Sequence, residues 1–289
     1  MATRVAFVLS GGGSHGAVQV GMLQALYERG IAPDTIVGTS VGAVNGAFIA
    51  GRPPTPSTAT ELARIWRDLK RSDVFPVQPL GGLRRLLGRN PALLSADALR
   101  ALVDRTTTFD RIEDATIPFH VIATDLLTGL EVCLSRGDLV EAVLASAAIP
   151  GIFPPRKIGG QTLVDGGVSN NTPISHCVGL GAETIYVLPT GNACALRQPP
   201  RTAMGIAMHS MTLLVMQRLI LEVQYYRESA RLVVLPPPCP LNVQPIDFSA
   251  SDRLVRVSRQ DSHRYLDDLE AGRAQAPISM HMHGHERKT

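Results

Sequence analysis

Two strand–turn–helix units follow one another within the first 51 residues, and this repetition constrains the fold more than any other feature. The run "RVAFVLS" predicts a short buried strand, and "HGAVQVGMLQALYERG" has apolar residues at helical spacing. The run "DTIVGTS" predicts a second strand, and "VGAVNGAFIAG" a second helix. Because parallel neighbours need a long crossover connection, this order predicts an α/β fold with a mostly parallel sheet.

The alternation continues to the end of the chain without a clear linker. We therefore predict one α/β domain over residues 1–275, followed by a disordered tail over 276–289. The segment 73–96 mixes Leu with Arg84, Arg85 and Arg89. It fits a lid that touches a lipid surface and equally a surface helix over the core.

Composition and charge exclude several classes of protein. A net charge of +3 gives no support for a nucleic-acid partner. The longest apolar candidate for a membrane span, "IAMHSMTLLVMQRLILEV", contains His209, Gln217 and Arg218. The four cysteines show no CxxC spacing, so we expect scattered thiols and no metal site. The prediction is a soluble, cytoplasmic protein of unknown oligomeric state.

Ser40 stands in a G-x-S-x-G pattern between the second predicted strand and the helix after it. Such a sharp turn exposes a nucleophilic serine, and Gly38 and Gly42 leave room around it. The start of the following helix favours negative charge at the same place. The alternative is an ordinary helix-capping serine in a glycine-rich turn.

The stretch "GGGSHG" follows the first predicted strand, and it allows three interpretations. Its G-x-G-x-x-G spacing fits a dinucleotide site, but no acidic residue ends the second strand, where the ribose would bind. The backbone N–H groups of Gly11, Gly12, Gly13 and Ser14 fit an oxyanion hole equally well. The third interpretation is a tight turn that needs glycine only for packing.

Asp165 lies in "VDGGVSNNTP", directly after a predicted strand. Gly166 and Gly167 let the chain turn sharply beneath it, so its carboxylate could accept a proton from Ser40. Taken alone, an Asp-Gly turn whose carboxylate caps backbone N–H groups explains the same residues. A histidine that would complete a triad is not evident, because only His15 lies in a glycine-marked turn. The residues point to a serine–aspartate pair.

The motifs "GGGSHG", "GTSVG" and "DGG", in this order, resemble those of the patatin-like phospholipase family over residues 5 to about 190. The resemblance implies a three-layer α/β/α sandwich and hydrolysis of lipid acyl esters without a metal ion or soluble cofactor. It implies Ser40 as the nucleophile, Asp165 as the base and the Gly11–Gly16 loop as the oxyanion hole. The partner it implies is a lipid ester, while peripheral contact with a membrane is an expectation from the segment 73–96.

The chain departs from the family pattern at His15, where the family commonly has Arg or Lys. A histidine is mostly neutral at pH 7, so any help it gives to anion binding should be weak and pH-dependent. Two other functions remain as alternatives. One is a nucleotide-binding oxidoreductase that uses the first glycine loop, and the other is an inactive lipid-binding relative of the family.

Overall fold

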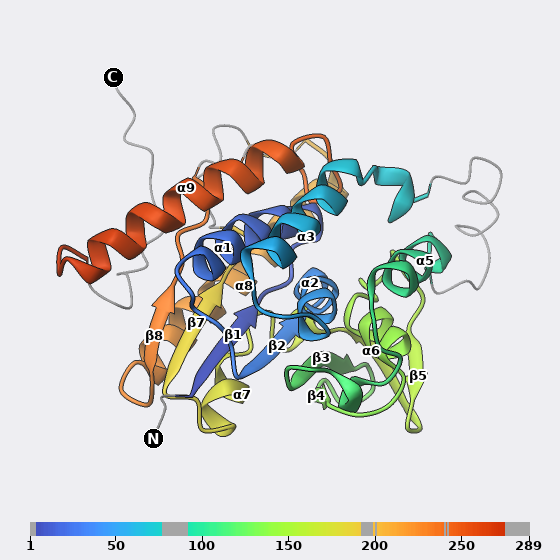
Figure 1. The fold of residues 1–289 in the computed structure, drawn as a ribbon. Coiled ribbons are helices and arrows are strands. Elements are labelled where there is room, and N and C mark those ends of the chain that lie inside the picture. Colours follow the sequence, from blue (N-terminus) through green and yellow to red (C-terminus); the bar gives the residue numbers. More distant parts are fainter. Residues whose placement is uncertain are drawn as a thin grey trace.

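The computed structural model describes residues 4–76, 92–191, 199, 201–239, 241 and 243–274, and an eight-stranded sheet forms its centre (Figure 1). The order is β5-β6-β3-β2-β1-β7-β8, and β4 pairs with β3. Five adjacent strands, β3, β2, β1, β7 and β8, pair in parallel. At one end of the sheet β4, β5 and β6 are added by antiparallel pairing. The strands are β1 (Val5–Leu9), β2 (Thr35–Thr39), β3 (Phe119–Asp125), β4 (Glu131–Leu134), β5 (Arg156–Ile158), β6 (Gln161–Asp165), β7 (Thr184–Leu188) and β8 (Arg231–Val234).

Helices cover both faces of the sheet, which confirms the three-layer α/β/α architecture. Phe7 and Leu9 of β1 face a core built with α1, α2, α3, α5, α6 and α9, whereas Ala6 and Val8 face α7 and α8. This split follows from the alternation of side chains along a strand. The helices are α1 (Gly16–Glu28), α2 (Val41–Ala50), α3 (Pro56–Asp68), α5 (Asp97–Thr106), α6 (Leu139–Ser146), α7 (Ile174–Gly179), α8 (Ala203–Tyr226) and α9 (Ser251–Glu270), with short 3-10 turns η1 (Gly13–His15), η2 (Arg71–Asp73), η3 (Ile112–Asp114) and η4 (Gly166–Val168).

Two strands, β2 and β6, lie end to end along the same edge of β3. Ala123 of β3 pairs with both β4 and β6, so these two strands occupy opposite edges. Ile122 pairs with both β4 and β2, so β2 also lies opposite β4. β6 therefore continues the edge that β2 leaves after Thr39, and because β6 is antiparallel its last residue, Asp165, meets the end of β2.

The hairpin β5–β6 contains a strand that the sequence patterns did not predict. Arg156–Ile158 pairs antiparallel with β6, and Gly159 and Gly160 make the two-residue turn. Both glycines have positive φ, 57° and 81°, as hairpin turns of this length require. The hairpin supplies the strand that carries Asp165.

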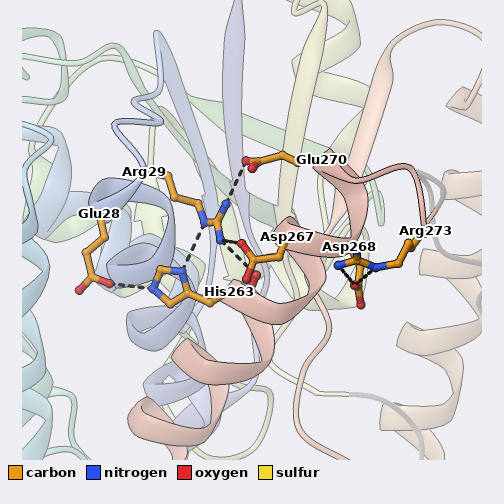
Figure 2. Close-up of polar contacts among 7 residues, drawn as sticks. All are labelled: Glu28, Arg29, His263, Asp267, Asp268, Glu270 and Arg273. Atoms are coloured by element: carbon orange, nitrogen blue, oxygen red, sulfur yellow. Dashed lines mark hydrogen bonds and ion pairs between the residues drawn. The ribbon is translucent and has the colours of Figure 1, made fainter.

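The last helix, α9, is attached to the end of α1 by a polar network (Figure 2). Glu28 accepts a hydrogen bond from His263 at 2.8 Å. Arg29 binds Asp267 and also Glu270 at 2.9 Å. α9 therefore packs on α1, on the side of the sheet that carries η1 and the glycine loop.

Several predictions concern segments at the margins of the described chain. Of the predicted lid, 77–91 lie outside the described residues, as does the tail 276–289, so the lid and the single domain stay predictions. Phe75 and Ala92, which flank the gap, are buried.

Among the described cysteines, Cys133 and Cys177 are free thiols, but the prediction was wrong for Cys239, which is disulfide-bonded. Within the described segments, no helix is long and apolar enough to cross a membrane.

Candidate active site

Ser40 occupies a strained turn between β2 and α2. Its φ of 53° makes it the one non-glycine residue with positive φ in the described part of the chain. A Cβ on Gly38 would lie 2.5 Å from the carbonyl oxygen of Gly42, and a Cβ on Gly42 would lie 2.0 Å from that of Leu9. Both glycines are thus required by backbone crowding, and the geometry is that of a nucleophile elbow.

A buried hydroxyl from another helix holds this turn. The Ser40 amide donates to Oγ of Ser146 at 2.8 Å, and Ser146 Oγ donates to the carbonyl of Ile122 at 2.5 Å. Ser146 ends α6 and is fully buried. Sequence reasoning missed it, because a serine at the end of an apolar helix carries no local signal.

The side chains of Ser40 and Asp165 meet. Ser40 Oγ donates to Oδ2 of Asp165 at 2.7 Å, and the amide of Gly167 donates to Oδ1 at 2.7 Å. Both side chains are more than nine-tenths buried. Burial raises the pKa of Asp165 to about 6, while the hydrogen bonds from Ser40 and Gly167 oppose this rise. A carboxylate with such a pKa is a better base than an exposed one and is still ionised at neutral pH.

The first glycine loop lies beside this pair. A Cβ on Gly11 would come within 3.1 Å of the Cβ of Ser40. The Gly11 amide donates to the carbonyl of Asn171 at 3.2 Å, and Thr190 Oγ1 donates to the Gly11 carbonyl at 2.6 Å. The loop after β1 is therefore fixed to the loop after β6 and to the end of β7.

A distant segment, residues 243–245, clamps the other side of the loop. The Ser14 amide donates to the carbonyl of Pro245 at 2.7 Å, and Ser14 Oγ donates to that of Gln244 at 3.0 Å. The amides of Gly11 and Ser14 are thus engaged. For the amides of Gly12 and Gly13, by contrast, no described residue serves as acceptor. Of these two residues, Gly13 lines the same pocket as Ser40.

His15 contacts the same clamp. Its Nε2–H donates to the carbonyl of Val243 at 2.8 Å. Burial lowers the pKa of His15, and the contact with Val243 offsets only part of that effect. The ring is therefore neutral at neutral pH and fastens the loop to the segment 243–245. Its predicted help in anion binding stays a prediction.

The remaining motif glycines allow close packing around the site. A Cβ on Gly16 would lie 2.5 Å from a methyl carbon of Val41 and 2.7 Å from the ring of Trp66. A Cβ on Gly166 would lie 2.2 Å from the carbonyl oxygen of Ile122. These residues bring α1 onto α2 and the Asp165 loop onto β3.

An apolar pocket opens from Ser40 between α2, α3 and α5. It is partly open to solvent. Its wall begins at Gly13 and Ser40, and aliphatic and aromatic side chains make up most of the rest. They include Val44, Phe48, Trp66, Phe75, Leu102 and Phe248.

In the part of the chain that the structure describes, no group of three or more His, Cys, Asp or Glu side chains could hold a metal ion.

A serine on an elbow at the edge of an α/β sheet, bonded to a buried carboxylate beside free backbone amides, defines a candidate serine hydrolase. The chain belongs to the patatin-like phospholipase family, whose sequence model matches residues 7–178.

Curated relatives agree with this assignment. The chain is 36% identical over 196 residues to an NTE family protein of Mycobacterium tuberculosis, an alignment that covers 65% of this chain and 50% of that protein. It is 30% identical over 190 residues to human patatin-like phospholipase domain-containing protein 6 and 33% identical over 202 residues to a lysophospholipase of Aspergillus terreus. These alignments each cover 65% of this chain but only 13% and 12% of the relatives.

The chain therefore spans about half or less of the length of these relatives. Among solved structures, human GIVD cytosolic phospholipase A2 aligns with a TM-score of 0.47 at 14% identity, covering 93% of this chain and 59% of that one.

Proposed function

We propose that the protein hydrolyses carboxylic esters of lipids, with Ser40 as the nucleophile and Asp165 as the base. The observation that carries this proposal is the 2.7 Å hydrogen bond from Ser40 Oγ to Asp165 Oδ2 at a strained elbow. Family membership and the apolar pocket that opens from Ser40 support it. The names of the relatives, a lysophospholipase among them, agree with the same class of substrate.

The reaction begins when Asp165 Oδ2 takes the proton of Ser40 Oγ and the oxygen attacks the ester carbonyl carbon. The carbonyl π electrons move to its oxygen, which becomes the oxyanion of a tetrahedral intermediate. When the intermediate collapses, the ester C–O bond breaks, and the alcohol leaves with the proton from Asp165. Water then repeats the sequence on the acyl-enzyme and releases the fatty acid and free Ser40.

The amides of Gly12 and Gly13 are the proposed donors to the oxyanion. No described residue accepts from either of them, and the clamp by residues 243–245 fixes the loop before a substrate arrives. Fixed donors need no reorganisation during the reaction, which is why such groups stabilise a developing charge so well. Gly11 and Ser14 support this loop through their engaged amides.

The pocket is proposed to bind one acyl chain. Val44 and Phe48 lie on the same face of α2 as the start of the pocket, one and two turns beyond Ser40. A fatty acyl chain is a matching ligand because it gains free energy from apolar contact along its whole length. The nucleotide-binding alternative finds no such support, since Ser14 and His15 of the loop bind carbonyls of residues 243–245.

A fluorescent fluorophosphonate tests the nucleophile directly, because it phosphonylates activated serines. We expect wild-type protein to be labelled, Ser40→Ala to be unlabelled, and Asp165→Asn to be labelled far more slowly. Ser57→Ala, an exposed serine of α3, is the matched control and should label like wild type. Equal labelling of Ser40→Ala and wild type would place the reactive serine elsewhere. Absence of labelling in the wild type would favour the inactive lipid-binding alternative.

A further inference from the structure

An exposed group of leucines stands on the turn between β3 and β4. Leu126, Leu127 and Leu130 are 53%, 82% and 67% exposed. Three large apolar side chains on one turn are unusual, because each loses free energy by its contact with water. We call residues 126–130 the leucine tip.

The leucine tip is a fixed structure. Asp125 accepts from the Leu127 amide at 3.2 Å and from the hydroxyl of Thr128 at 2.9 Å. The Gly129 amide donates to the Asp125 carbonyl at 2.8 Å, and Gly129 has a φ of 71°, which its lack of a side chain allows. These bonds hold the leucines outward and keep them from folding back onto the core.

The tip lies on the catalytic edge of the sheet. Ser40 follows Thr39, the partner of Ile122, and Asp165 pairs with Ala123. β3 runs parallel to β2 and continues beyond the residues that pair with Thr39 and Asp165. Leu126 follows Ala123 by three residues, which places it about 10 Å further along the strand direction. Val168, which follows the Asp165 loop, is 48% exposed on the same edge.

A cation accompanies the apolar group. The Leu126 amide donates to the carbonyl of Thr162 at 2.8 Å, and Thr162 pairs with Lys157 of β5. Lys157 is exposed, and no described carboxylate forms an ion pair with it. The leucine tip itself contains no carboxylate, and that of Asp125, which precedes it, is buried and engaged in the turn. The edge therefore presents apolar side chains beside a positive charge.

We propose that the leucine tip, with Val168 and Lys157, docks the protein onto an anionic lipid surface. This proposal rests on the proposed function, since a membrane is where a lipid ester resides. In this arrangement Ser40 and Asp165 lie about 10 Å along β3 from the lipid surface that the leucines enter.

A second copy of the chain is a poorer occupant of this edge. Aromatic side chains bury about 150–250 Å² each, and three leucines and a valine bury less. Because these four residues are only 48% to 82% exposed, they offer less than about 630 Å² together even at the aromatic upper value, short of the roughly 800 Å² per partner that a stable interface needs.

Vesicle sedimentation tests the proposal, using the double variant Leu127→Gln, Leu130→Gln. The matched control is Leu214→Gln, Leu221→Gln, which removes two leucines that are 70% and 63% exposed on α8, over the other face of the sheet. With phosphatidylcholine–phosphatidylglycerol vesicles, we expect partitioning of the tip variant to fall by about tenfold or more, because two apolar side chains no longer enter the lipid. The control should partition like wild type. Lys157→Gln should lose about fivefold on these vesicles and nothing on pure phosphatidylcholine.

Hydrolysis of a soluble short-chain ester separates this proposal from the proposed function. The tip variant should cleave that ester at the wild-type rate, and Ser40→Ala should bind vesicles like wild type. Unchanged partitioning of the tip variant would overturn the docking surface while leaving the hydrolase in place. A wild-type dimer that the tip variant converts to a monomer would also overturn it. Failure of the wild type to cleave any ester would instead overturn the proposed function.

Discussion

The amide of Ser40 donates to the hydroxyl of Ser146 at 2.8 Å, so a helix terminus 106 residues away supports the strained elbow. Ser146→Ala leaves the Ser40 N–H and the Ile122 carbonyl buried without a partner. We expect a loss of about 1–3 kcal/mol in unfolding free energy. The turn would also shift, and kcat should fall about 10- to 100-fold.

Urea unfolding and ester kinetics measure both effects of Ser146→Ala. The control is Ser258→Ala, which removes a fully buried hydroxyl that donates to the carbonyl of Val18 at 2.7 Å, away from the site. The control should lose stability and keep kcat. If Ser146→Ala lost stability alone, Ser146 would be a packing residue with no effect on the elbow.

Asp165→Asn should make the protein more stable at neutral pH while nearly abolishing catalysis. The folded-state pKa of Asp165 is raised from 3.8 to about 6, so the folded protein holds this proton more tightly than the unfolded chain. Stability from this group is thus greatest below pH 4 and falls as the pH rises to about 6, by about 3 kcal/mol in all. Asparagine does not ionise, so the advantage of the variant should appear above pH 6 and vanish below pH 4. Urea unfolding across this range measures it, and a constant difference would contradict the assignment.

The rate of ester hydrolysis should have an acid limb near pH 6. A base must be unprotonated to accept the Ser40 proton, so kcat/KM falls as Asp165 becomes protonated below its raised pKa of about 6. Initial rates with a soluble ester between pH 4.5 and 8 measure the limb. An apparent pKa near 4 would mean that Asp165 is an ordinary carboxylate in the free enzyme.

Gly42→Ala should disrupt the elbow. The new Cβ would lie 2.0 Å from the carbonyl oxygen of Leu9, and both atoms belong to rigid backbone. We expect a loss of at least about 3 kcal/mol or failure to fold. Gly179→Ala is the control, because a Cβ there meets nothing within 4 Å, and its effect should stay within about 0.5 kcal/mol. Thermal unfolding compares the two, and equal stability would contradict the crowding argument.

Val44→Phe should shorten the acyl chain that the pocket accepts. Val44 lies on the pocket wall one turn beyond Ser40, and a phenyl ring there fills space beyond the first few carbons. We expect kcat/KM for a long-chain ester to fall at least about tenfold relative to a short-chain ester. Rates with a series of p-nitrophenyl esters measure this ratio, and the short ester is the internal control. An unchanged ratio would place the acyl chain elsewhere.

Local signals in the sequence predicted the elements around Ser40 and Asp165. A G-x-S-x-G turn between strand and helix depends on residues within one turn of each other, so the sequence displays it directly. The sequence allowed us to propose that Asp165 lies beside Ser40, but it did not reveal which strand arrangement brings the two residues together. That arrangement is the shared edge of β3, which only the register of β2, β4 and β6 reveals.

Other features had weak local signals or none. The β5 strand has a weak local signal. In "PRKIGGQTLV", Gly159 and Gly160 separate two short strand-like segments, but the first segment has only three residues. The clamp on the glycine loop joins Ser14 to Gln244, 230 residues apart, through backbone carbonyls that any sequence would offer. Ser146 likewise has no local sequence signal, because its importance comes from its contact with the distant turn at Ser40.

The end-to-end arrangement of β2 and β6 has a consequence for the newly made chain. Ser40 leaves the ribosome early with β1, β2 and α2, 106 residues before Ser146, whose hydroxyl supports its elbow. Its carboxylate partner lies 125 residues later, on a strand that can dock only after β3 is in place. An incomplete chain therefore carries the serine without its base. Under the proposed mechanism, ester cleavage begins only when the sheet has closed around both residues, so a nascent chain that stops short of Asp165 is inactive.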